Sequence, residues 1–142
     1  MSTTHTLTAT FLRGLAEAGF DFSSGTSDVF KIALYTAMTG LDYTTTVYTT
    51  TNEASGTGYT AAGATLTIAT NPTVDDRTAY LTFTDPAWTS ATFTARGALI
   101  YKADGATNPS VAVLDFDSTY GVTAGTFTVD MPTKLIKLMA GV

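Results

Sequence analysis

Few residues in this 142-residue chain could do chemistry. His5 is the only histidine, and there is no cysteine. A Ser-His-Asp or Cys-His arrangement would therefore depend on a single imidazole. A general base must also be held within hydrogen-bond reach of its partner, whereas we expect His5 to lie in a mobile N-terminal segment. The sequence predicts no catalytic residue and favours a protein that is not an enzyme.

Two pairs of neighbouring carboxylates are the next candidates. Asp115 and Asp117, in "LDFD", would share one face of a strand and could bind Ca²⁺ or act in acid–base catalysis. Ca²⁺ takes 6–8 oxygen ligands, and no ligand loop surrounds this pair, so a solvated strand end that enters a turn is the simpler interpretation. Asp75 and Asp76 are read as a turn with a surface ion pair to Arg77. We expect no metal and no cofactor.

Glycines and aromatic residues offer two further possibilities. The segment "SGTGY", residues 55–59, lacks the lysine and the following helix that a phosphate-binding loop needs. Trp88 could form a sugar-binding platform with Tyr43, Tyr48 and Tyr59. Alternatively, Trp88 fills the core and the tyrosines pack a loop onto the body, which we favour because tryptophan is highly buried on average.

Composition excludes some classes of partner. The net charge is −5, and the seven basic residues are scattered without a run, so nucleic-acid binding is not expected. No stretch approaches 18 apolar residues, and the N-terminus lacks the pattern of a secretory signal. Only 13% of residues are charged, while about thirty are threonine. A polar surface with so little charge suits a protein whose neighbours are other proteins.

One segment near the N-terminus has a helical pattern. Thr6 or Thr8 could cap the start of this helix, and Gly19 could end it. Its apolar residues recur at spacings of four, four and three, namely Leu7, Phe11, Leu15 and Ala18.

The rest of the chain reads as strands. Residues 29–37, "VFKIALYTA", alternate between a dry face, with Phe30, Ile32 and Leu34, and a wetter face, with Lys31, Ala33 and Tyr35. Residues 37–60 are expected to form a long ordered connection, which in compact domains is usually functional.

Further strands are separated by turn signals. They are expected at residues 64–69 and within "RTAYLTF", "SATFTARGALIYK" (with Gly97 at a bulge or close contact), "VAVLDF", "GVTAGTFTVDM" and "TKLIKLM". About seven short strands indicate an all-β fold. We predict a single antiparallel β-sandwich with a short N-terminal α-helix, in which residues 1–27 form the helix and connecting loop and residues 28–142 the sandwich domain.

Longer motifs resemble a known family. "VFKIALYTAMTGLDYTTTVYTTTNEASGTGYTAAGATL" resembles the opening module of small structural proteins of tailed bacteriophages. The later segments "TARGALIYKADGATNPSVAVLDF" and "GTFTVDMP" also match, so the resemblance covers about residues 28–139. One departure is Ala62, where the family pattern has the first glycine of a pair.

The resemblance implies a virion protein with a compact, jelly-roll-like β fold. Such a protein decorates or cements the outer surface of the capsid, having been made in the cytoplasm of the bacterial host. The expected partners are the major capsid protein and further copies of the chain, as a dimer or trimer. Nucleic acid and membranes are not expected as partners. The alternative is a tail- or fibre-associated protein that binds glycan.

The long connection is the candidate protein-interaction loop. Its acidic side chain and asparagine could bind backbone amides, and its last tyrosine could pack its ring while the hydroxyl finds a partner. Its glycines allow backbone conformations that other residues resist. The candidate residues are Tyr43, Tyr48, Asn52, Glu53 and Tyr59.

Overall fold

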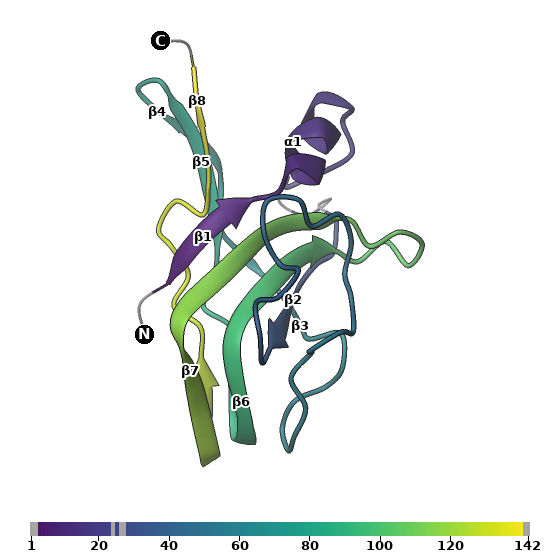
Figure 1. Cartoon of the computed structure of the whole chain (residues 1–142). Helices are drawn as coiled ribbons and strands as arrows, with labels where there is room; N and C mark the ends of the chain where they lie inside the picture. The colour runs from purple at the N-terminus through teal and green to yellow at the C-terminus, as the bar shows by residue number, and fades with distance from the viewer. Residues whose placement is uncertain (1–2, 24, 26–27, 141–142) are drawn as a thin grey trace.

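The computed structural model describes residues 3–23, 25 and 28–140. All its strand ladders are antiparallel, and they form a five-stranded sheet in the order β1-β7-β6-β2-β3 and a three-stranded sheet in the order β4-β5-β8 (Figure 1). The elements are β1 (Thr4–Leu7), α1 (Ala9–Ala16), β2 (Phe30–Tyr35), β3 (Ala64–Thr65), β4 (Ile68–Asp75), β5 (Thr78–Phe83), β6 (Ala87–Lys102), β7 (Ser110–Thr128) and β8 (Ile136–Met139).

The main core lies between the two sheets. Phe83 of β5 packs against Phe30 of β2 with ring centroids 5.7 Å apart. Leu81 and Ile136, on the inner face of the three-stranded sheet, are buried in the same core as Ile32. The predicted all-β, sandwich-like fold is confirmed, while the jelly-roll connectivity stays a prediction.

Part of the outer face of the five-stranded sheet is also buried, because the connection between β2 and β3 packs over it. Ala33 and Tyr35 are 0% exposed, together with Leu99 of β6. Leu41, from the connection, belongs to the same small core. The wetter face predicted for residues 29–37 is therefore wrong for Ala33 and Tyr35, since alternation in the sequence could not show that a loop covers them, while Lys31 is half-buried.

The N-terminal segment pairs with the sheet through strand β1, where the sequence pattern indicated only a helix. His5 lies in β1 opposite Leu114 of β7, so the expected mobile terminus is wrong for this residue. The helix is confirmed but begins later, at Ala9. Thr8 is its N-cap and accepts a hydrogen bond from the backbone N–H of Phe11. The division after residue 27 stays a prediction.

Strands β6 and β7 form a long, irregular hairpin. A register shift occurs between Ala95 and Gly97, and a Cβ at Gly97 would lie 2.6 Å from the carbonyl oxygen of Leu114. The predicted bulge or close contact is confirmed. Beyond it, β7 continues through Asp117, which has a positive φ of 63°, so the two strands expected there are one bent strand. Residues 64–69 instead divide between β3 and the start of β4.

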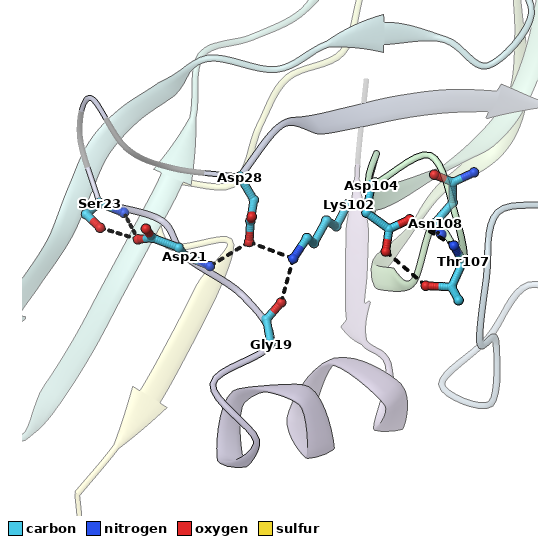
Figure 2. A network of polar contacts seen from close by, with 8 residues as sticks. All are labelled: Gly19, Asp21, Ser23, Asp28, Lys102, Asp104, Thr107 and Asn108. Atoms are coloured by element: carbon cyan, nitrogen blue, oxygen red, sulfur yellow. Dashed lines mark hydrogen bonds and ion pairs between the residues drawn. The ribbon is translucent and has the colours of Figure 1, made fainter.

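Lys102, at the end of β6, fastens the segment after α1 to the sheet (Figure 2). Its Nζ donates to the carbonyl oxygen of Gly19 at 2.9 Å and lies 3.1 Å from Asp28 Oδ2. The same carboxylate oxygen accepts a hydrogen bond from the backbone N–H of Asp21 at 2.8 Å. One ammonium group therefore joins the end of the helical segment, the start of β2 and the end of β6.

Candidate functional site

The candidate site is the connection between β2 and β3, residues 36–63, which we call the threonine loop. Asp42 and Glu53 are its only charged residues. It is fixed to β2 by the backbone N–H of Ala54, which donates to the carbonyl oxygen of Leu34 at 2.8 Å. At its other side the backbone N–H of Tyr48 donates to the carbonyl oxygen of Asn108 at 3.0 Å. The loop is therefore an ordered layer, as the sequence predicted.

The carboxylate of Glu53 organises the interior of the loop. It accepts hydrogen bonds from Tyr48 Oη at 2.6 Å, from Tyr59 Oη at 2.8 Å and from the backbone N–H of Ala62 at 2.7 Å. Three segments of the loop thus converge on one acceptor. Bonds to an ionised acceptor are stronger than neutral ones, so this arrangement stiffens the loop.

Tyr59 joins this cluster to the main core. Its ring packs edge-on against Phe93 at 5.5 Å, while its hydroxyl also accepts a hydrogen bond from the backbone N–H of Leu34 at 3.0 Å. The prediction that Tyr59 anchors the loop by ring and hydroxyl is confirmed.

Two tyrosines outside the predicted set complete the cluster. Tyr35 Oη donates to the carbonyl oxygen of Thr49, and Tyr101 Oη to that of Ala62, both at 2.7 Å. Burial, and then the charge of Glu53, raise the pKa of Tyr35 and raise the pKa of Tyr101 to about 12. Both hydroxyls therefore stay protonated at neutral pH and act as donors. Tyr35 pairs with Gly97 and Tyr101 with Lys31, so the two tyrosines lie toward opposite ends of the β2–β6 ladder, and only the path of the loop shows that both hydroxyls reach it.

The other candidate residues lie on the surface. Tyr43 is 62% exposed, and Val47, in the same loop, is 42% exposed. Asn52 is also exposed, in a left-handed conformation with φ of 61°, and its carbonyl accepts a hydrogen bond from the backbone N–H of Thr36. A shallow hollow near Val47 is lined by Thr39, Gly40, Thr44, Thr45, Thr46, Val47, Thr49 and Thr51. The structure thus brings Tyr48, Glu53 and Tyr59 together and leaves Tyr43 and Asn52 apart from them.

Trp88 fills the core. It is 6% exposed and meets Phe93 and Phe127 edge-on, each at 6.2 Å between ring centroids. This confirms the core interpretation of Trp88. The alternative, an aromatic platform of Trp88 with Tyr43, Tyr48 and Tyr59, is not formed, because Trp88 is buried and the hydroxyls of Tyr48 and Tyr59 donate to Glu53.

The two pairs of neighbouring carboxylates make ion pairs and hydrogen bonds within the fold. Asp115 forms an ion pair with Arg96 and accepts a hydrogen bond from the backbone N–H of Asp117 at 2.7 Å. The expected strand end is wrong, because this is a bend inside β7. Asp75 lies 3.2 Å from Lys134 Nζ, so the expected ion pair of these carboxylates with Arg77 is not seen. Among the described residues, no group of three or more acidic, histidine or cysteine side chains could hold a metal ion.

Comparison with known proteins gave no match to a family model, to a curated protein or to a solved structure. Within residues 3–23, 25 and 28–140, no helix has the length and apolar character needed to cross a bilayer.

Proposed function

We propose that this chain is a non-enzymatic structural protein of a tailed-phage virion, which binds the outer surface of the assembled capsid and stabilises it. The observation that carries the proposal is the threonine loop: a long, ordered, nearly uncharged layer whose interior is fixed by Glu53. The capsid as the partner rests on the resemblance of residues 28–139 to small tailed-phage structural proteins.

The loop has the properties of a preformed protein-binding surface. Its one internal carboxylate, Glu53, is held by three hydrogen bonds within the loop, and its other charged group, Asp42, accepts a hydrogen bond from the backbone N–H of Thr44 at 2.7 Å. Ordering the loop therefore adds little entropy cost at the moment of binding. Tyr43 and Val47 stand out from the threonines as exposed anchors. Tyrosine is enriched in the residues that dominate binding energy.

The mechanism requires no reaction. A protein that binds the assembled lattice but not its free subunits stabilises the lattice by mass action. A surface with few charges can lie against a second surface with little electrostatic repulsion. Many copies, each making a modest contact, would then brace neighbouring capsid subunits.

The direct test is co-sedimentation of the purified chain with capsids that lack it. Tyr43→Ala and Val47→Asp should each lower the bound fraction at least several-fold, since truncating an interface anchor costs over 1 kcal/mol. Val29→Asp, at another exposed valine, which directly precedes β2 and lies outside the loop, is the matched control. Unchanged capsid binding by both loop variants would refute the assignment of the loop.

A second measurement tests bracing. Capsids stripped of this protein should remain assembled but lose resistance to heating, and adding the protein back should restore it. Equal melting of stripped and decorated particles would contradict a stabilising role.

A further inference from the structure

The three-stranded sheet extends beyond the body of the sandwich (Figure 1). Its apolar face extends with it, as the strand register and the side-chain exposures show. Leu81 and Ile136 pair across β5 and β8 and are buried. Two residues further out, Ala79 lies between Val74 and Leu138 in the next cross-strand row of the same face. Here Val74 is 73% and Leu138 40% exposed. The apolar face therefore continues past the point where the body covers it.

The strand at one edge of this sheet is open. The backbone N–H of Ala140 donates to the carbonyl oxygen of Arg77 at 2.7 Å, which makes these two residues a hydrogen-bonded pair. Hydrogen-bonded and non-hydrogen-bonded pairs alternate in an antiparallel ladder. Ala79 and Leu138 are consequently the next hydrogen-bonded pair, and the backbone groups of Lys137 and Met139 point away from β5, toward the open edge.

The other sheet edges are less suited to pairing. The β4 edge contains Pro72 and two register shifts, features that block strand addition. The β3 edge is two residues long. The β1 edge has an exposed THT run without a neighbouring apolar row. Among the described edge strands, β8 combines free backbone groups with two exposed apolar side chains, Leu138 and Met139, the latter 69% exposed, and has neither a proline nor a register shift.

We propose that two copies of this chain pair through their β8 strands, antiparallel about a two-fold axis at Leu138, to form one continuous six-stranded sheet. An unpaired strand edge is a template for a second strand, whose alternating donors and acceptors match its own. A second copy offers the identical edge, and an interface with two-fold symmetry must be self-complementary. The dimer does not depend on capsid binding and can be tested without capsids.

Charge selects the register. With Leu138 opposite Leu138 of the partner subunit, Lys137 pairs with the partner's Met139, and the outward backbone groups of these residues make hydrogen bonds in both directions. A shift that brings Lys137 opposite the partner's Lys137 would place like charges together, which is destabilising. The chosen register also joins the two Val74–Ala79–Leu138 rows into one apolar strip.

The geometry leaves room for the second body. Strand β8 runs outward from Ile136, which is buried, to Met139 at the projecting tip. Because the pairing is antiparallel, the partner's Ile136 lies opposite Ala140. The partner's body is thus beyond the tip, away from the first body. The overlap is short, so the dimer is weak, with a dissociation constant in the high micromolar to millimolar range.

Sedimentation equilibrium of the full chain, from micromolar to millimolar concentration, tests the dimer. The average mass should rise toward twice the monomer mass. Met139→Pro removes an outward N–H and no bond to β5, so it should keep the protein monomeric. His5→Pro, which removes the corresponding outward N–H of the β1 edge, is the matched control and should dimerise normally. A wild-type chain that stays monomeric at millimolar concentration, or a Met139→Pro variant that still dimerises, overturns the proposal.

A second pair of variants tests the register by charge, and this test does not depend on whether the proline variant folds. Met139→Glu places a carboxylate opposite the partner's Lys137 at two symmetric positions and should tighten the dimer by roughly two- to thirtyfold. Met139→Lys should weaken it over the same range. If both substitutions change the dissociation constant in the same direction, the register is wrong.

Discussion

Replacing Glu53 tests whether its carboxylate holds the threonine loop. Glu53→Ala removes the acceptor of three hydrogen bonds, from Tyr48, Tyr59 and the backbone of Ala62. A hydrogen bond to a charged group contributes about 1.5–3 kcal/mol net. The cluster is only partly buried, so water can replace the carboxylate for some donors. Taking the lower value and one donor rescued by water, we expect a loss of about 3 kcal/mol in the free energy of unfolding.

Glu53→Gln should cost less, about 1–2 kcal/mol. The amide oxygen can keep the bonds from Tyr59 and Ala62. The amide nitrogen then faces Tyr48 Oη, whose hydroxyl can turn to accept instead of donate. The graded loss separates the acceptor role of the side chain from its packing.

Urea unfolding, with the slope on denaturant monitored, gives the free energies directly. In thermal unfolding the alanine variant should melt about 10 °C lower, since 1 kcal/mol corresponds to roughly 3 °C for a domain of this size. Tyr43→Ala, at a loop tyrosine outside the cluster, is the control and should be nearly neutral. If Glu53→Ala were as stable as Tyr43→Ala, the carboxylate would not be what orders the loop.

Three further outcomes follow from single positions. Ala62 has a φ of 72°, a left-handed conformation that costs a non-glycine residue roughly 1–2 kcal/mol. Ala62→Gly should therefore raise the melting temperature. A lower melting temperature would contradict backbone strain at this residue. Because the pKa of Tyr101 is raised to about 12 and that of Tyr35 is also raised, the stability that they contribute is complete below about pH 10, the pKa of unfolded tyrosine. It should fall as pH rises above that value, by up to about 1.4 kcal/mol per pH unit for each group; urea unfolding across the alkaline range that shows no such decline would contradict the burial. Hydrogen bonds from the backbone N–H of Asn108 and from other donors of the same turn lower the pKa of Asp104 to about 2. Asp104→Asn should therefore reduce stability at neutral pH, and the difference from the wild type should vanish as pH falls from the unfolded pKa near 3.9 toward about 2. A stability difference that persists in acid would exclude this carboxylate as its cause.

The sequence was most informative where periodicity and a local signal agree. Alternation located β2 and β5, and Thr8 was a candidate cap from its residue type alone. Gly97 stood out because a glycine inside a long apolar strand usually marks a bulge or a close backbone approach. These features depend on neighbours within a few residues, which is why they could be predicted without knowing the fold.

Features that depend on distant segments were not predictable in the same way. Tyr35 was assigned to a wetter face because the chain does not reveal that residues 36–63 fold back over it. His5 belongs to an edge strand whose order comes from pairing with β7, more than a hundred residues away. The partner of Asp75 is Lys134, a contact made only when β8 joins the sheet.

The candidate loop shows the same division. Its extent, and the anchoring role of Tyr59, followed from local composition. Convergence of Tyr48 and Tyr59 on Glu53 required the loop's path in three dimensions. Ala62 was visible in the sequence as a departure from the pattern that the loop resembles, but its left-handed backbone conformation became clear only in the structure.

The position of the threonine loop has a consequence for synthesis of the chain. Leu99 and Val113 reach the outer face of the sheet from β6 and β7, both of which are translated after the loop. When these strands leave the ribosome, the segment that shields them from water already exists and is attached to β2. A circular permutant that begins at residue 64 would reverse that order, exposing bare apolar strands first, and its nascent chains should aggregate more readily during expression.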